Sequence, residues 1–137
     1  MQQKKEKLVQ QYFESWISQD VNILTEIFTE DCKYIESYGT AYNNLKQIIF
    51  WFKDFHAKGG KVFEWKIYDF FHKNDELMVT WYFKHEFQDP KNTYNYEDVP
   101  NEFDGISIIK FNANGKINYL REFKSNIPNH YPYLEMI

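Results

Sequence analysis

Apolar residues recur with helical spacing in three segments of the chain. From Lys5 to Ser18 they repeat at i, i+1, i+4 and i+5, which forms one face of an α-helix. Asp20 can accept hydrogen bonds from the free N–H groups that open a second short helix, over residues 21–28. A third helix is expected from Ala41 to Lys58, and Gly59-Gly60 predict its end.

The rest of the chain favours β-structure. A short strand is expected from Cys32 to Ser37, ended by Gly39. Aromatic and β-branched residues predominate after the third helix, and two polar segments, 73–76 and 112–115, predict hairpin turns. Four further strands are therefore predicted, at Val62–His72, Leu77–Gln88, Phe103–Asn112 and Lys116–Asn126.

Strand alternation predicts which side chains share a face. One face of the second long strand carries Leu77, Val79, Trp81, Phe83, His85 and Phe87. On the last strand, the interior face is expected to carry Asn118, Leu120, Glu122 and Lys124, and the other face Ile117, Tyr119, Arg121 and Phe123. The interior face of the last strand would therefore hold two charged groups.

The order helix, helix, strand, helix and four long strands predicts an α+β fold. We expect a cone-shaped, curved antiparallel sheet wrapped around three N-terminal helices, with residues 1–137 forming a single domain. The polar segment Asp89–Asn101 is predicted to be a lid or a loop tip. The tail Ile127–Ile137 is expected to pack irregularly over a surface.

Composition narrows the possible partners and the compartment. The formal net charge is −4 and positive charge is thinly spread, which argues against nucleic acid as a partner. Cys32 is the single cysteine, so no disulfide can form within the chain and a reducing compartment is favoured. No segment has the roughly 18 uninterrupted apolar residues of a membrane span, so the sequence predicts a soluble, cytoplasmic protein with no membrane partner.

Two passages carry a family resemblance. The stretch SQDVNILTEIFTEDCKYIESYG near the start and FNANGKINYLREF near the end occur in the same order and between the same predicted elements as in the nuclear transport factor 2-like superfamily. The chain resembles its SnoaL-like and ketosteroid isomerase-like members over nearly its whole length. The resemblance implies a cone with a pocket between the concave sheet and the helices, which several members use for proton transfer on small hydrophobic molecules.

The same resemblance implies roles for individual residues. Aligned without gaps from Tyr12 to Gly39, Tyr12 matches the oxyanion-stabilising tyrosine of the ketosteroid isomerases, and Glu36 matches their general base. Their second oxyanion donor, a protonated aspartate, falls on Ser107, which is shorter and less acidic; steroid isomerisation is therefore not expected. SnoaL-like cyclases also place an acid on a late strand, and Glu122 is the candidate here.

Each candidate also has a structural interpretation. Glu36 can be a solvent-facing acid at a strand end, and Tyr12 can be a core tyrosine with a satisfied hydroxyl. Glu122 can be bonded to a helix or to Lys124, and His85 can be a core histidine. The four histidines share no metal-ligand spacing, so neither a metal nor another cofactor is predicted.

The sequence thus predicts a protein that binds a small hydrophobic molecule in the cone, with an isomerase, cyclase or dehydratase type of reaction. In that mechanism Glu36 or Glu122 removes a proton next to a carbonyl, and Tyr12 with Ser107 holds the oxyanion. The residues expected to bind the molecule are Ser107, His85, Lys124, Trp65, Trp81, Phe83 and Leu120.

The alternative is a non-enzymatic ligand-binding or dimeric interaction module. If Trp65, Trp81 and Phe83 filled the pocket and left no room for a ligand, that module would be favoured. Large apolar groups on the opposite strand faces, including Ile106, predict a homodimer through the outer face of the sheet.

Overall fold

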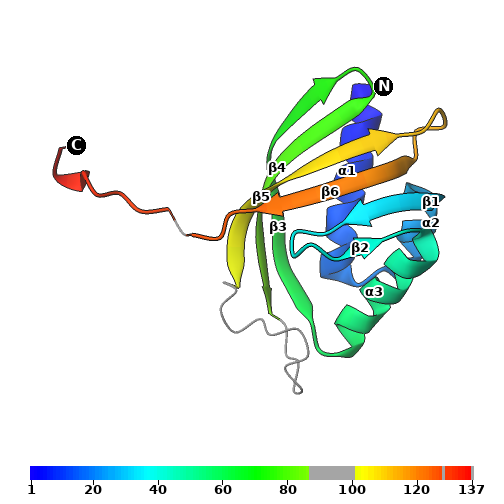
Figure 1. Ribbon diagram of the computed structural model, residues 1–137, viewed down its shortest axis with the longest axis horizontal. Helices are drawn as coiled ribbons and strands as arrows, with labels where there is room; N and C mark the ends of the chain where they lie inside the picture. Colours follow the sequence, from blue (N-terminus) through cyan, green and yellow to red (C-terminus); the bar gives the residue numbers. More distant parts are fainter. Residues whose placement is uncertain (87–100, 128, 137) are drawn as a thin grey trace.

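A computed structural model describes residues 1–86, 101–127 and 129–136 of the chain. One six-stranded sheet curves around helices α1 and α3 (Figure 1). Most of the expected loop Asp89–Asn101, and Phe87, lie outside the described residues. The elements in chain order are α1 Gln2–Ser18, η1 Val21–Ile23, α2 Leu24–Ile27, β1 Phe28–Ile35, β2 Ala41–Tyr42, α3 Leu45–Ala57, β3 Lys61–Lys73, β4 Glu76–Glu86, β5 Glu102–Phe111, β6 Ile117–Lys124 and η2 Leu134–Met136.

The first helix forms as predicted, and the second is shorter than predicted. Helix α1 ends at Gln19, which takes a left-handed conformation with φ of 62°. The side chain of Asp20 then accepts a 3.1 Å hydrogen bond from the N–H of Asn22, which confirms its capping role. Because Phe28 already has extended backbone, the helical segment ends at Ile27 and β1 begins four residues earlier than expected.

The third helix also begins later than its apolar spacing predicted. Residues Ala41 and Tyr42 form the short strand β2, which pairs with β1. Asn44 caps α3, because its side chain accepts a 2.9 Å hydrogen bond from the N–H of Gln47. The helix ends before Gly59, whose φ of 86° confirms the predicted stop.

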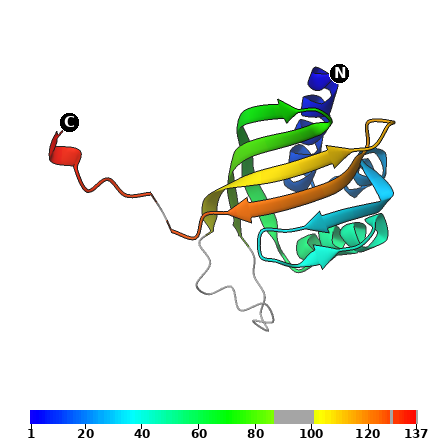
Figure 2. The same cartoon turned by 45° about the horizontal axis from the view of Figure 1, so that its top comes forward.

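The sheet has the strand order β2-β1-β6-β5-β4-β3. Its four long strands, β3 to β6, are antiparallel neighbours as predicted. Strand β1 runs parallel to β6, so the sheet is mixed and not purely antiparallel. This pairing joins an early segment to the last strand and places β1 and the edge strand β2 beside α3 (Figure 2).

Alternation holds along β4 and is interrupted where the strand register shifts, twice between β3 and β4 and once between β5 and β6. Leu77, Val79, Trp81 and His85 of β4 are all buried on one face, as predicted. In β6 a register shift against β5 leaves Ile117 buried, so its predicted placement on the opposite face is wrong. The Asn-Gly hairpin turn forms as expected, with Gly115 at φ of 84°.

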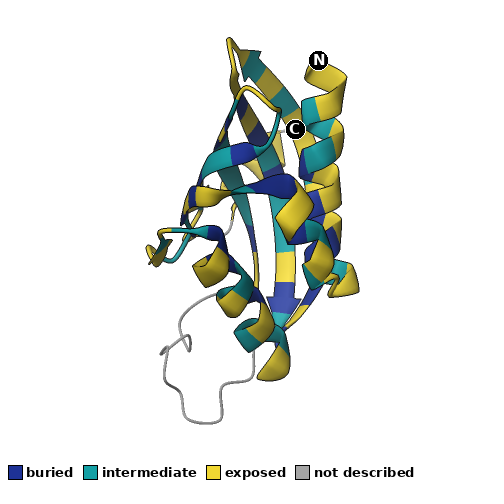
Figure 3. Ribbon diagram, turned by 90° about the vertical axis from the view of Figure 1, so that its right-hand side faces the viewer, coloured by how far each residue is buried: buried dark blue, intermediate teal, exposed yellow. Residues whose placement is uncertain are grey.

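The core lies between the concave side of the sheet and the helices. In Figure 3 the buried parts of the α1 ribbon lie on the side of the helix that faces the sheet, and the exposed parts lie on the side away from it. Trp16 of α1 packs against Phe52 of α3 with ring centroids 4.5 Å apart, which holds the two helices together. The described part of the tail is exposed and projects from the body (Figures 1 and 2), so the expectation that it packs over a surface is wrong.

Among the described residues, no helix is both long and apolar enough to cross a membrane.

Candidate functional site

A cavity of about 250 Å³ opens between the concave face of the sheet and helices α1 and α3. Aromatic rings form most of its wall, and the acidic side chains and the imidazole in its described lining are two glutamates, one aspartate and one histidine. The described lining residues are Trp16, Glu36, Ser37, Tyr38, Thr40, Tyr42, Phe50, Trp51, Asp54, Phe55, Val62, Trp65, Trp81, Phe83, His85, Phe103 and Glu122.

Glu36 follows the end of β1 and is only 7% exposed. Alternation along the strand places it on the same face as Cys32 and Tyr34, which are both buried. A tight turn then carries the chain away: Gly39, at φ of 92°, donates its N–H to the Glu36 carbonyl at 2.9 Å. Glu36 is therefore held inside the cone by backbone geometry.

Burial brings the pKa of Glu36 close to neutral pH. Loss of solvent raises the pKa of its carboxyl to about 7, against the smaller lowering effect of hydrogen bonds from Thr40 and Tyr38. Its Oε1 atom is buried and has no hydrogen-bond partner among the described residues. A carboxyl with this pKa takes up and releases protons near neutral pH.

Glu122, on β6, is a second buried carboxyl, 8% exposed. Burial, together with a smaller contribution from the negative charge of Glu36, raises its pKa to about 8. Hydrogen bonds from the Tyr34 hydroxyl and the Ser37 backbone N–H have the opposite effect. Ile35 of β1 is paired with Arg121 of β6 in the parallel register. Glu36 directly follows Ile35 and Glu122 directly follows Arg121, so the two acids are neighbours.

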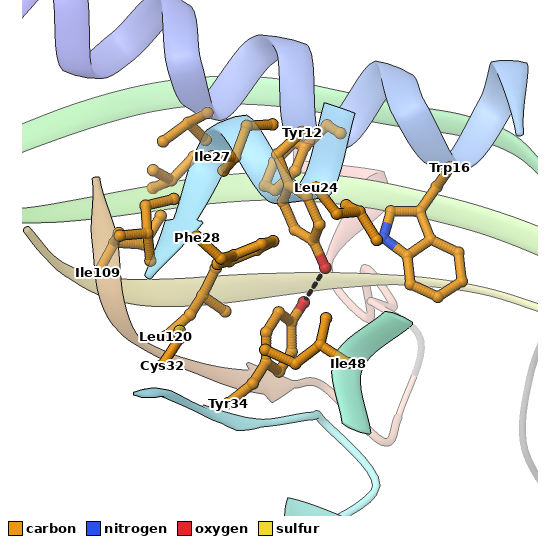
Figure 4. Packing of buried hydrophobic residues seen from close by; sticks show 14 of the residues in the cluster. Tyr12, Trp16, Leu24, Ile27, Phe28, Cys32, Tyr34, Ile48, Ile109 and Leu120 are labelled. Atoms are coloured by element: carbon orange, nitrogen blue, oxygen red, sulfur yellow. Dashed lines mark hydrogen bonds between the residues drawn. The ribbon is translucent and has the colours of Figure 1, made fainter. Parts of the chain in front are cut away.

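Two tyrosines form a hydrogen-bonded chain behind Glu122. The hydroxyl of Tyr34 donates to Glu122 Oε2 at 2.7 Å, and the hydroxyl of Tyr12 donates to the oxygen of Tyr34 at 2.6 Å (Figure 4). Both tyrosines are fully buried, and burial raises the pKa of each. Tyr12 is not among the cavity-lining residues; it is linked to the cavity by its hydrogen bond to Tyr34, which bonds Glu122, and by a ring contact with Trp65, with centroids 5.7 Å apart.

His85 also lines the cavity, at the far end of β4. Its Nδ1 lies 3.2 Å from the carbonyl oxygen of Asn101, to which it can only donate. Burial lowers the pKa of His85, although the Asn101 carbonyl partly offsets this effect. The ring is therefore neutral at pH 7, with Nε2 as its unprotonated nitrogen.

The remaining predicted binding residues fall into two groups. Trp65, Trp81 and Phe83 line the cavity and still leave it open. Three others are not among the lining residues: Ser107, Leu120 and Lys124.

The contacts of these three explain where they lie. Ser107 is fully buried and accepts a 2.9 Å hydrogen bond from the indole N–H of Trp81, so it orients a wall residue. Leu120 belongs to the apolar core. The Lys124 ammonium lies 5.2 and 5.5 Å from the ring centroids of Tyr38 and Phe103, and also binds the side chain of Asn126.

Sequence reasoning missed Tyr34 and the helical side of the cavity. Tyr34 could have been found, since it alternates with Cys32 and Glu36 in one strand. Trp16 and Trp51 lie on apolar helical faces, where spacing alone does not distinguish a cavity wall from solid core. Within the described ranges, no group of three or more His, Cys, Asp or Glu residues could hold a metal ion.

Solved structures with the same fold support the architecture. A protein with a ketosteroid isomerase-like fold from Catenulispora acidiphila DSM 44928, in complex with trimethylamine, aligns with a TM-score of 0.67 and 15% identity over 86% of this chain and 85% of that one. An LEH-like epoxide hydrolase from M. tuberculosis aligns with a TM-score of 0.72 and 9% identity, over 90% of this chain and 84% of that one. An NTF-2 like protein of unknown function from Burkholderia xenovorans LB400 aligns with a TM-score of 0.70 and 11% identity, over 98% and 93%.

These likenesses confirm the expected nuclear transport factor 2-like fold. No curated protein matches the sequence. Residues 9–120 match the SnoaL-like domain, a range that covers most of the chain and includes Glu36, whereas Glu122 lies two positions beyond its end. The chain therefore belongs to the SnoaL-like domain family.

Proposed function

We propose that this protein is an acid–base enzyme that acts on a small, mainly apolar molecule in the cavity. The observation that carries the proposal is the pairing of two buried carboxyls, Glu36 and Glu122, in the wall of one cavity. Isomerisation, cyclisation and dehydration each need one proton to be removed and another to be supplied. Two neighbouring carboxyls with different pKa values can do both.

Glu36 is the base in this proposal. With a pKa of about 7, a substantial fraction of it is ionised at neutral pH, and its Oε1 atom has no partner in the described protein. Burial among rings leaves the carboxylate poorly solvated, which strengthens it as a proton acceptor. The proton that it removes is one next to a carbonyl or similar electron-withdrawing group.

Glu122 is the acid. Because its pKa is about 8, it is mostly protonated at pH 7 and can donate a hydrogen bond to an oxygen on which negative charge develops. This role replaces the one that the sequence suggested for Tyr12 and Ser107, whose recorded hydrogen bonds are to Tyr34 and Trp81. Tyr12 and Tyr34 are positioning residues, because they act through Glu122.

The proposal can be tested without knowing the natural substrate. The probe is 5-nitrobenzisoxazole, a neutral carbon acid. A base takes its C–H proton, the released electron pair forms a nitrile, and the N–O bond breaks to leave a phenolate. We expect Glu36→Gln to lower kcat/KM at pH 8 by about 100-fold or more, as loss of a general base does.

The matched control is Glu30→Gln, which removes an exposed carboxyl from the same strand and should leave the rate unchanged. In the wild type, kcat/KM should rise with pH around a midpoint near 7, the pKa of Glu36. A wild-type rate no higher than that of Glu36→Gln would show that Glu36 is not a base.

We also propose that two copies of the chain associate through the outer face of the sheet. Phe71, Met78 and Ile108 are cross-strand neighbours on that face, and Phe123 pairs with Ile106 beside them. Phe71 on β3, Met78 on β4 and Phe123 on β6 are each more than 40% exposed, and large exposed apolar groups gathered on one face are typical of an interaction surface. This row is the support for a self-complementary interface.

Sedimentation velocity over a concentration series tests the dimer. Met78→Glu should convert it to a monomer, because a charge would be buried at its centre. Phe50→Glu, at a residue on α3 that is 72% exposed, should leave it intact. A wild-type monomer at every concentration would refute the interface.

A further inference from the structure

We infer that the cavity takes a small organic cation, an ammonium ion that carries alkyl groups. This inference rests on the proposed function in that it concerns the same cavity and names the class of molecule that enters it. Three features of the cavity support it: its rings, its charges and its size.

The rings form two walls that belong to different layers of the fold. Trp16, Trp51 and Phe55 come from the helices, and Trp65, Trp81 and Phe83 come from the sheet. The faces of aromatic rings carry negative electrostatic potential and attract cations, and tryptophan does so most strongly. A ring-lined cavity is the arrangement that proteins use to hold alkylammonium groups.

The protein already uses rings of this cavity to hold a positive charge. The Lys124 ammonium lies over the rings of Tyr38 and Phe103, which both line the cavity. Lys124 itself is not among the lining residues, and it is also hydrogen-bonded to Asn126 at 2.6 Å. The six rings of the two walls are not those that Lys124 covers.

The charges of the described lining residues also favour a cationic ligand. Glu36, Glu122 and Asp54 are acids, and His85 is the sole group that could become positive. Lys58 lies 3.0 Å from Asp54 and offsets that charge, but within the described part of the chain neither glutamate forms an ion pair. A bound cation would supply the missing positive charge.

Glu36 is the acid beside which a bound cation would be most favourable. It is 7% exposed, lines the cavity, and its Oε1 has no hydrogen-bond partner among the described residues. A buried carboxylate oxygen without a partner is costly, and a cation beside it removes much of the cost. The cation would also favour the ionised form of Glu36, which is the form that acts as the base in the proposed reaction.

Size sets the upper limit of the ligand. The cavity of about 250 Å³ is below the range of roughly 300–1,000 Å³ that holds drug-sized molecules. An ammonium ion with a few short alkyl groups fits within this limit. The inferred ligand class is therefore a small alkylammonium compound and not a large cationic lipid or a peptide.

The test compares two probes of nearly the same shape. Choline and 3,3-dimethylbutan-1-ol differ in one central atom, a positively charged nitrogen in the first and a neutral carbon in the second. Calorimetric titration of the full chain with each probe at pH 8.5 isolates the contribution of charge. We expect choline to bind at least ten-fold more tightly than the alcohol.

The groups that face the cavity predict how this preference changes with pH. Glu36 and Glu122 ionise between pH 6 and 9. The other charged groups near them are Asp54, which is paired with Lys58, and Lys124, which lies over the rings of Tyr38 and Phe103. Choline should bind more weakly at pH 6, where both glutamates are mostly protonated and any proton on His85 adds positive charge. The neutral alcohol should bind equally at both pH values.

A matched variant separates this inference from the proposed function. Glu36→Gln should remove most of the preference for choline and leave the affinity for the alcohol unchanged, while Glu30→Gln alters neither. Equal binding of the two probes by the wild type, or no binding of choline, would overturn the inference even if 5-nitrobenzisoxazole is turned over through Glu36. Preferential binding of choline without Glu36-dependent turnover would leave the inference standing and refute the enzyme.

Discussion

The hydroxyl of Tyr34 donates a 2.7 Å hydrogen bond to Glu122 Oε2, and both groups are buried. This bond stabilises the charged form of Glu122 against the cost of burial, so it lowers a pKa that burial has raised. It also joins β1 to β6, which are parallel neighbours. The same contact therefore tunes the proposed acid and fixes its position.

Removing the Tyr34 hydroxyl should raise the pKa of Glu122 above about 8. Tyr34→Phe takes away the donor to the carboxylate and also the acceptor of the Tyr12 hydroxyl. We expect a loss of about 1–3 kcal/mol in the free energy of unfolding, because buried polar groups lose their partners. The carboxyl ¹³C shift of Glu122 against pH measures the pKa, and denaturant unfolding measures the stability.

Tyr12→Phe is the matched control, since it leaves the bond from Tyr34 to Glu122 in place. It should shift the pKa of Glu122 much less than Tyr34→Phe does. If both variants shifted that pKa equally, the two tyrosines would not form a directional chain.

The free energy of unfolding should fall as the pH rises from 6.5 to 8.5. Glu36 and Glu122 have folded-state pKa values of about 7 and 8, above those of an unfolded glutamate, so the folded protein holds more protons in this window. Each carboxyl costs roughly 1.4 kcal/mol per pH unit while it is ionised only in the unfolded chain. His85, with a lowered pKa, has the opposite effect, but only below the ordinary pKa of histidine near 6.5.

Glu122→Gln tests whether ionisation of Glu122 lowers the free energy of unfolding as the pH rises. The amide keeps an oxygen that can accept from Tyr34 and does not ionise, so the variant should be more stable than the wild type at pH 8.5 and show a smaller dependence on pH. Thermal unfolding at pH 6.5, 7.5 and 8.5 gives both quantities. A variant less stable than the wild type at pH 8.5 would mean that the ionised Glu122 is favourable where it lies.

Period-two alternation explains why the sequence placed Glu36 and Glu122 correctly near one interior. Once each strand is identified, its buried face follows from residues two positions apart, as with Tyr34 and Glu36. Their nearness depends on the parallel pairing of β1 with β6, and strand order is not a local property of the chain. The sequence could not show that the two carboxyls are neighbours without an alignment.

The partner of a buried hydroxyl is harder still to predict. The helical stripe of α1 correctly directs Tyr12 toward the interior. Whether its hydroxyl reaches a cavity or another side chain depends on ring positions across three elements, α1, β1 and β6. For Ser107 likewise, the face of the strand was predictable and the bond from Trp81 was not.

Gly105 makes room for a wall of the cavity. It is paired with Trp81 across β4 and β5, and a Cβ atom at this position would lie under 3.0 Å from the Trp81 ring and 2.5 Å from the carbonyl oxygen of Phe123. Its φ is not positive, so alanine would introduce a steric conflict without backbone strain. We expect Gly105→Ala to cost about 1–3 kcal/mol in unfolding free energy, as overpacking does, and to displace Trp81 into the cavity.

A double-mutant cycle assigns this cost to the ring. The nearest Trp81 atoms, Cη2 and Cζ2, belong to the outer ring of the indole, which phenylalanine lacks. Gly105→Ala should therefore be less destabilising in a Trp81→Phe background than in the wild type, and denaturant unfolding of the four proteins measures the coupling. Equal costs in both backgrounds would place the conflict at the Phe123 carbonyl, because phenylalanine leaves that backbone contact unchanged.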